Sequence, residues 1–315
     1  MESLLEAADD QTFIKVAEVW IPEDGNLVLA EGNYGALSDF AETSRKTRFA
    51  KGEGLPGRAW AEERPVVLQS LDDAAFVRRD AAARAGLTSA VAIPVFAGSQ
   101  LKAVLLMLCG GDAQHAGAIE VWQEQAGKLT LGDGYYGHAE SFAAASHEIS
   151  FAVGQGLPGG VWAANTPIVM KDLGRSGAFL RARQAAQANL TTGVGVPVPV
   201  PSGERYVLTL LSAPDTPIAH RFELWDARQN SVGTTPRAIL IDGICEREGA
   251  LWPQQSPPVD AKSVAPWHGP IGRVLGSGQP YVQSGPTGLP AGYQQLIALP
   301  VYHGAELAYV VAWYL

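Results

Sequence analysis

The chain has 315 residues, of which 47% are hydrophobic and 17% are charged, a balance typical of folded globular proteins. This length accommodates two or three domains. The formal net charge of −9 argues against a phosphate backbone as a partner, so we expect no nucleic acid. No apolar run approaches the roughly 20 residues of a membrane span, and the acidic first residues do not resemble a secretion signal. We expect a cytoplasmic protein with no membrane partner.

The first hundred residues predict an α+β unit with an antiparallel sheet. Segments rich in Val, Ile and aromatic residues, separated by Gly- and Pro-containing turns, indicate strands, and a Pro after a Gly-rich turn indicates a short helix. In chain order we expect a strand, a hairpin turn, a strand, a short helix, a second short helix, a strand, a third helix and two apolar strands. These cover residues 13–21, 22–25, 26–31, 38–47, 56–60, 65–68, 72–85, 89–96 and 101–108.

A nine-residue signature, Gly-x-Gly-Leu-Pro-Gly-x-x-Trp, occurs at residues 52–60 and again at residues 154–162. Other residues recur in step with it, at a shift of 102 positions that becomes 103 later in the repeat. The matched pairs include Glu18 and Glu120, Trp20 and Trp122, Tyr34 and Tyr136, Phe49 and Phe151, Phe76 and Phe179, and Pro94 and Pro197. Self-similarity at a fixed period indicates a tandem array of structural units.

A third and more divergent copy fills the remainder of the chain. Glu223-Leu224-Trp225 repeats the opening triplet, Ile271-Gly272-Arg273 stands in the place of residues 56–58, and Leu299-Pro300-Val301 in the place of residues 93–95. The stretch between the last two landmarks is shortened, and the helical segment with Phe76 has no counterpart. We therefore predict three domains, at residues 1–110, 111–215 and 216–315, the last of them abridged.

The order of elements and several motifs of the first copy resemble the GAF domain family. The motifs are the nine-residue signature, Pro65-Val66-Val67, Phe76 with its Arg- and Ala-rich segment, and the sequence from Gly86 to Val95. The match covers most of the first two copies and the latter half of the third. The resemblance implies modules similar to PAS domains, in which an antiparallel sheet carries short helices on one face and a small molecule is held between them. Some GAF modules bind no ligand and serve as dimerisation platforms.

Two departures from the family bear on organisation. The long helices that bracket typical GAF modules have no room here, because only residues 110–116 separate the last strand of the first copy from the first strand of the second. We therefore expect the three sheets to lie close together. The chain contains no segment that resembles a kinase, cyclase, phosphodiesterase or DNA-binding domain, so we expect the output to pass through a separate protein partner, such as a signalling protein. A homo-oligomer is a further expectation.

The aromatic residues that recur in register have two interpretations. One is a ligand pocket, because ligand sites are concave and largely apolar or aromatic. The other is core packing, which large aromatic residues dominate. The candidate ligand-binding aromatics are Trp20, Tyr34, Phe49, Trp60, Phe76, Trp122, Tyr136, Phe151, Trp162 and Phe179.

Arginines follow the last aromatic of each set. Arg78 and Arg79 in the first copy, and Arg181 in the second, lie on the segment that lines the pocket in GAF modules, and an anionic ligand favours Arg for its bidentate geometry. A solvated helix surface is the alternative interpretation of these three residues. Both interpretations remain open from the sequence.

Glu18, Glu120 and Glu223 each precede a first-strand Trp by two residues and so share its sheet face. If that face is covered, each carboxylate needs a partner, because an unpaired buried charge is costly. Arg58 and Arg273 are the partners that we consider, and a solvent-facing Glu is the alternative.

Little in the sequence indicates catalysis or a bound cofactor. Cys109 and Cys245 occupy non-equivalent positions in different copies, so we expect two buried thiols rather than a disulfide or a zinc site. Neither is placed for covalent bilin attachment, and the histidines show no metal-binding spacing. The cofactor, if any, is unknown. Our leading hypothesis is a non-enzymatic sensory or regulatory protein that binds a small molecule in its GAF-like pockets, and the alternative is a ligand-free protein-interaction scaffold.

Overall fold

The computed structural model describes residues 12–111, 115–228, 236–245, 249–251 and 262–315. The first residues, on which the expectation about a secretion signal rests, and residues 112–114 of the short connection lie outside this part. Within it the strands form three antiparallel sheets with short helices, so the predicted α+β class is confirmed. None of the helices in these ranges has the length and apolar character needed to cross a membrane.

Unit 1, as we name the segment from β1 to β6, contains the strands and helices that the sequence predicts, in the predicted order. Its sheet runs β3-β2-β1-β6-β5-β4. The elements are β1 (Ile14–Glu23), β2 (Asn26–Asn33), α2 (Ser38–Lys46), β3 (Arg48–Ala50), α3 (Gly54–Glu62), β4 (Val66–Leu68), α4 (Arg79–Arg84), β5 (Leu87–Ala97) and β6 (Gln100–Gly110).

Unit 2, from β7 to β12, repeats this order, and its sheet has the equivalent arrangement β9-β8-β7-β12-β11-β10. Its elements are β7 (Ala116–Gln125), β8 (Lys128–Gly137), α5 (Glu140–Glu148), β9 (Ser150–Phe151), α6 (Gly156–Ala164), β10 (Ile168–Lys171), α7 (Ala182–Gln187), β11 (Thr192–Pro199) and β12 (Arg205–Ser212).

Unit 3, from β13 to β19, keeps the same path, β15-β14-β13-β19-β18-β17, with β16 paired to β14. In its described part it has one helix, α8, and no counterpart of α4 or α7, as the shortened sequence predicts. Its elements are β13 (Arg221–Asp226), β14 (Ala238–Cys245), β15 (Gly249–Ala250), β16 (Ser263–Val264), α8 (Gly269–Ser277), β17 (Tyr281–Ser284), β18 (Gln295–His303) and β19 (Glu306–Tyr314).

The third helix of the sequence prediction is shorter than expected. We predicted a helix that starts at Asp72 or Asp73 and runs through Phe76, but the chain up to Arg78 is not helical and α4 begins at Arg79. Unit 2 shows the same geometry, because α7 begins after Arg181. The turns direct Phe76 and Arg78 into unit 1 and leave Val77 between them exposed.

Both faces of each sheet are buried, which explains why the central strands are apolar along their whole length. In β6 the side chains of Leu105 and Met107 enter a core shared by all three units, while Leu106 and Leu108 enter the core under the helices of unit 1. The common core therefore holds the backs of the three sheets together, as the short connection between the first two copies predicts.

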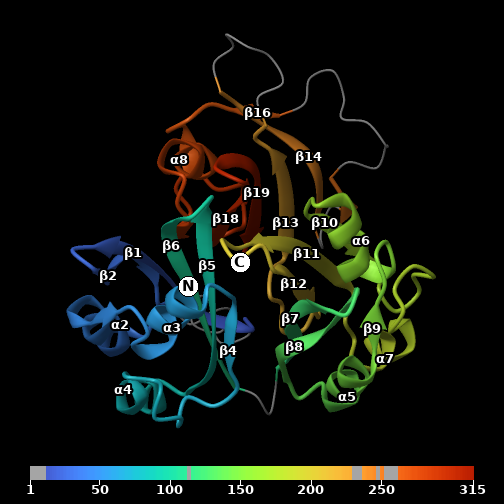
Figure 1. Cartoon of the computed structure of the whole chain (residues 1–315), viewed down its shortest axis with the longest axis horizontal. Helices are drawn as coiled ribbons and strands as arrows, with labels where there is room; N and C mark the ends of the chain where they lie inside the picture. Colours follow the sequence, from blue (N-terminus) through green and yellow to red (C-terminus); the bar gives the residue numbers. More distant parts are fainter. Residues whose placement is uncertain (1–11, 112–114, 229–235, 246–248, 252–261) are drawn as a thin grey trace.

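The three units are arranged as a ring. The equivalent strands β5, β11 and β18 contact one another near the centre, and the helices lie at the periphery (Figure 1). Around the ring, β4 of unit 1 contacts β8 of unit 2, β10 of unit 2 contacts β14 of unit 3, and β17 of unit 3 contacts β2 of unit 1. Each unit thus places its fourth strand beside the second strand of the next unit, and after three such junctions the ring closes.

The glycines of the repeated signature have a structural explanation. A Cβ on Gly57 would lie 2.2 Å from the carbonyl oxygen of Ala50, and one on Gly159 would lie 2.1 Å from that of Ala152. Gly272 of unit 3 makes the equivalent approach, 2.4 Å from the oxygen of Ala265. The signature therefore allows a helix to begin directly against the preceding segment, and it does not itself constitute a ligand site.

Because one core joins the units, we expect a substitution in it to affect all of them. Leu105→Ala should lower the free energy of unfolding by about 2–5 kcal/mol and increase amide hydrogen exchange in β11 and β18 as well as in unit 1. The adjacent Leu106→Ala is the matched control, because Leu106 is equally buried but belongs to the core of unit 1 alone. Hydrogen exchange with mass spectrometry measures both effects. Increased exchange confined to unit 1 in Leu105→Ala would contradict the shared core.

Candidate functional site

A carboxylate lies in the middle of the covered face of each sheet. Glu18 on β1, Glu120 on β7 and Glu223 on β13 each have 0% exposure. The neighbouring Trp, two residues later on the same face, donates its indole N–H to the carboxylate in every unit, at 2.9, 3.2 and 3.0 Å respectively. These residues therefore lie on the face of each sheet that the helices cover, and the solvent-facing alternative for the three glutamates is wrong.

In unit 1 the partner of the carboxylate is Arg78. Its Nη1 donates to Glu18 Oε1 at 2.6 Å and its Nη2 donates to Oε2 at 2.8 Å, a bidentate ion pair whose two side chains are 2% and 0% exposed. Arg78 also donates to the hydroxyl of Ser44, which in turn donates to the carbonyl oxygen of Phe40 at 2.9 Å. Every oxygen and both terminal nitrogens of the pair are thus satisfied, as a buried charge requires.

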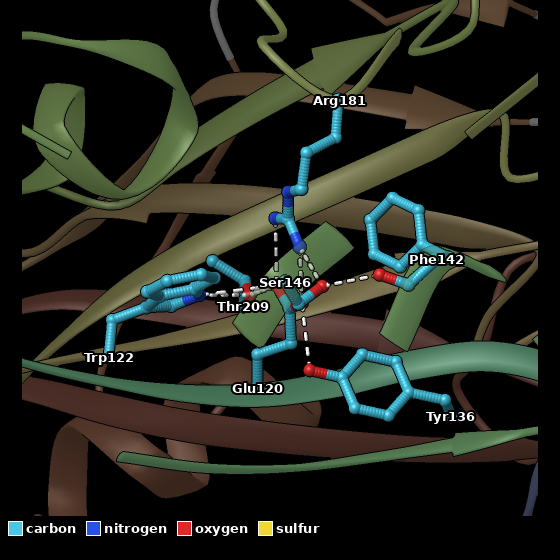
Figure 2. Close-up of polar contacts among 7 residues, drawn as sticks. All are labelled: Glu120, Trp122, Tyr136, Phe142, Ser146, Arg181 and Thr209. Carbon is cyan, nitrogen blue, oxygen red and sulfur yellow. Dashed lines mark hydrogen bonds and ion pairs between the residues drawn. The ribbon is translucent and has the colours of Figure 1, made fainter. Parts of the chain in front are cut away.

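Unit 2 repeats the arrangement around Glu120 (Figure 2). Arg181 binds both carboxylate oxygens, with its Nη2 2.9 Å from Oε2, and it also donates to the hydroxyl of Ser146. Two further donors are present here, Tyr136 at 3.2 Å from Oε1 and Thr209 at 2.9 Å from Oε2. The carboxylate of Glu120 therefore accepts more hydrogen bonds than that of Glu18.

Four aromatic rings surround each guanidinium. In unit 1 the Cζ atom of Arg78 lies 4.8 to 5.7 Å from the ring centroids of Phe40, Trp20, Phe76 and Phe49. In unit 2 the Cζ atom of Arg181 lies 4.4 to 5.7 Å from those of Phe142, Trp122, Phe179 and Phe151. Ring faces attract cations most strongly when water is excluded, so each cage stabilises the Arg that it encloses.

In unit 3 a different arginine pairs with the buried glutamate. It lacks the segment that carries Arg78 and Arg181, and Arg221 on β13 binds Glu223 instead, with its Nη2 2.6 Å from Oε1. The hydroxyl of Tyr314 donates to Glu223 Oε2 at 2.7 Å. Burial and the charge of Glu223 both raise the pKa of Tyr314, so its hydroxyl stays protonated and remains a donor.

The electrostatics of the unit 2 site favour the ionised carboxylate. Burial alone raises the pKa of Glu120, but the charge and hydrogen bonds of Arg181, with those of Ser146 and Thr209, outweigh it and hold the pKa below its usual value. Burial and the charge of Glu120 together raise the pKa of Tyr136, which therefore stays a neutral donor. The site is an ionic cluster in an aromatic shell, in which both carboxylate oxygens and both terminal nitrogens of Arg181 are paired and its Nε is buried without a partner.

Most of the sequence-predicted site residues meet in these two cages, although a few do not. Tyr34 and Tyr136 are buried beside them, and their rings lie 6.3 Å from those of Phe40 and Phe142. Trp60 and Trp162, by contrast, are half-buried on α3 and α6, outside both cages, and Arg79 is exposed. The residues that meet in the cages are Trp20, Phe49, Phe76, Arg78, Trp122, Phe151, Phe179 and Arg181.

The partners that we considered for the glutamates were incorrect. Arg58 lies on α3 and pairs with Glu62 one helical turn away, while Arg273 of α8 pairs with Glu31 of unit 1. Both arginines reach solvent, whereas the turns before α4 and α7 point an arginine inward. Sequence reasoning also missed Phe40, Ser44, Phe142 and Ser146, although these residues recur at the same shift of 102 positions.

The described residues offer little for metal binding or thiol chemistry. No group of three or more His, Cys, Asp or Glu side chains in these ranges could hold a metal ion. Cys109 points into the common core, and Cys245 lies 3.0 Å from the hydroxyl of Tyr293 in unit 3; both thiols are free and buried.

Comparisons with known proteins agree with the fold. Residues 1–127 match the family model described as "GAF domain". No curated protein matches the chain. The match covers the residues of unit 1, which resembles a GAF domain, and the second and third units repeat the sheet order of the matched one.

Several solved structures are similar over about one unit. The GAF domain of nlh2 from A. aeolicus is 22% identical, with 35% of this chain and 67% of that chain covered and a TM-score of 0.26. A GAF domain/HD domain protein from Geobacter sulfurreducens is 13% identical, with 35% and 72% covered and a TM-score of 0.28. A free methionine-R-sulfoxide reductase from Neisseria meningitidis, solved with its substrate, is 19% identical, with 34% and 59% covered and a TM-score of 0.26.

Removing one member of a buried pair should cost far more than removing both. Arg181→Met leaves Glu120 charged and unpaired in an apolar site, and we expect a loss of about 3–5 kcal/mol in the free energy of unfolding. Glu120→Leu combined with Arg181→Met should lose less than Arg181→Met alone. Urea denaturation measures both. Arg183→Met, two residues further along the chain and exposed, is the control. Equal stability of Arg181→Met and this control would contradict the pairing.

The low pKa of Glu120 predicts a specific pH dependence. A carboxylate whose pKa is lower in the folded state contributes stability that is complete above its unfolded pKa of about 4.3 and is lost as the pH falls through the lower, folded value. We therefore expect the free energy of unfolding to fall below about pH 4.3, and to fall less steeply in Glu120→Gln. Urea midpoints measured between about pH 5 and about pH 2.5 test this. Identical slopes in the two proteins would exclude Glu120 as a contributor.

Proposed function

We propose that the chain is a non-enzymatic regulatory protein that acts through a protein partner, and that units 1 and 2 are closed modules filled by their own arginines. The observation that carries the proposal is the position of Arg78 and Arg181. Each guanidinium lies between the sheet and the covering segments, at the centre of the aromatic set that the sequence offered as a ligand pocket. The ligand-free scaffold is thus the hypothesis that we now favour over small-molecule sensing inside these pockets.

Energetics support this choice. A small molecule that entered either cage would have to displace a bidentate Arg–Glu pair and leave at least one buried charge without its partner. Breaking such a pair costs about 3–5 kcal/mol, which a ligand would have to supply before it gained any affinity. The space is therefore better suited to holding the unit rigid than to sensing a metabolite.

The placement of reactive groups supports a role without catalysis. The one Glu at the centre of each unit is bound by Arg and indole donors and is not free to act as a general base. Of the two cysteines, Cys109 lies on the face of its sheet away from the helices, and Cys245, on the helix-covered face of unit 3, is buried against the hydroxyl of Tyr293. The two free thiols also suit the reducing cytoplasm, which we retain as the proposed location.

The proposal that Arg78 fills the pocket of unit 1 can be tested by removing its side chain. In Arg78→Ala the cage should be vacant, and ethylguanidinium at millimolar concentration should raise the melting temperature of the variant by several degrees. The wild type, whose cage is occupied, should show no such rise. Arg79→Ala, the exposed neighbour, is the matched control and should behave as the wild type. A similar rise in all three proteins would contradict the assignment of the cage.

The partner can be tested with a variant whose cage is refilled by apolar side chains. Glu18→Leu combined with Arg78→Met should keep the fold, since apolar replacement of a buried pair is often tolerated. A protein captured by the tagged full-length chain in its own cells should form a complex with the purified variant as tightly as with the wild type. Loss of that complex in a variant that retains its circular dichroism and thermal transition would favour sensing through the cage.

A further inference from the structure

One junction of the ring differs from the other two. At each junction an acidic residue on the second strand of one unit faces the fourth strand of its neighbour. The three acids are equivalent in position, because in the strand register each lies opposite the residue that follows the buried Glu. They are Asp133, Asp242 and Glu31, paired with Val121, Leu224 and Val19. The side chains that the neighbouring units bring to these acids are not equivalent.

The first two junctions are closed by long side chains. Gln69, just after β4, donates to Asp133 at 3.0 Å and to the carbonyl oxygen of Gly134 at 3.2 Å. Lys171, the equivalent residue on β10, lies close enough to Asp242 to lower its pKa, although burial is the larger influence and raises it. The space behind these contacts holds apolar groups, because Tyr135 and Ile244 pack against the common core.

The third junction, between units 3 and 1, has short and polar residues at the same places, and its acid, Glu31, is paired with Arg273 of α8 instead. Ser284 occupies the position of Gln69 and Lys171, and Asn33 occupies the position of Tyr135 and Ile244. A cleft of about 600 Å³ opens there, lined by both residues. It is bounded by α2 on one side and, on the other, by the shortened loop 285–294 that replaces the α4 segment in unit 3. The abridgement of unit 3 therefore leaves a hollow that the other junctions fill.

The lining of the cleft combines polar and apolar groups in similar measure and carries positive charge. Asn33 is 4% exposed and donates to the side-chain oxygen of Gln295 at 2.5 Å, so two amides form its floor. Ser38, Ala41 and Arg45 face it from one side of α2, and His220 faces it from unit 3. Arg45 is exposed and has no hydrogen bond or ion pair among those of the described residues, although its charge also acts on Glu42 of the same helix. No Asp or Glu belongs to the described lining.

We propose that this cleft between units 1 and 3 binds a small polar molecule that bears a carboxylate. Its volume lies within the range of small-molecule sites, which occur preferentially between domains. Arg45 would receive the carboxylate through bidentate hydrogen bonds, and the amides and hydroxyls would orient the rest. A planar guanidinium binds a carboxylate through two parallel hydrogen bonds, and inorganic phosphate is the anion that competes for the same geometry. The site is distinct from the caged arginines and does not depend on the partner that we propose above.

The chain itself supplies the variant that closes the cleft. Asn33→Tyr combined with Ser284→Gln gives the third junction the residues that close the first, so this variant should fold with at least the thermal stability of the wild type. Arg45→Ala removes the proposed carboxylate partner and leaves the cleft open. Arg48→Ala, an exposed arginine on the neighbouring β3, is the matched control.

The probes are acetate, succinate, glutamate and citrate, with inorganic phosphate as the competing anion, and calorimetry and thermal shift measure binding to the full-length protein. We expect at least one carboxylate to bind the wild type and Arg48→Ala saturably. Binding should be at least tenfold weaker to Arg45→Ala and absent from the closed variant. The proposal is overturned if none of the four carboxylates binds, if phosphate binds more tightly than all of them, or if the closed variant binds as well as the wild type.

Discussion

The ion pair at the centre of each unit is the constraint on which the rest of the structure depends. A carboxylate placed on the covered face of a sheet has to be paired, because burying it alone would cost several kcal/mol. Units 1 and 2 meet this need by turning an arginine inward just before a short helix, and the aromatic residues pack around it. Unit 3 has lost that segment, yet it still pairs its glutamate, with Arg221 from the same strand. The buried glutamate thus has an arginine partner in all three units, even where the segment before α4 and α7 has no counterpart.

The features that could be predicted from the sequence are those set by residues close together in the chain. The order of the elements along the chain, the repeats and the α+β class could be predicted, because glycines and aromatic residues recur in register and act locally. The faces of Glu18 and Trp20 also followed from strand alternation. The pairing of Glu18 with Arg78 did not, since the two residues are 60 positions apart and Arg78 lies in a turn that helix periodicity misplaces. Periodicity describes one element, whereas the site is made where three elements meet.

The cleft between units 3 and 1 shows a second limit. Asn33 and Ser284 are unremarkable in the sequence, since polar residues at strand ends are common. They become informative only when the structure places them opposite each other, at positions that are apolar or long in the other two junctions. Because the three junctions are repeats of one another, their residues can be compared position by position. The two closed junctions show which residues the third would contain if it served packing alone.

The cyclic contact between units has a consequence for assembly. A head-to-tail contact propagates without limit unless its rotation brings the last copy back to the first. Here the rotation does so after three copies within one polypeptide, and the edge strands β4, β10 and β17 each lie against the following unit. An exposed strand edge is the usual template for fibre growth, and in this architecture one edge strand of each sheet lies against another unit of the same molecule.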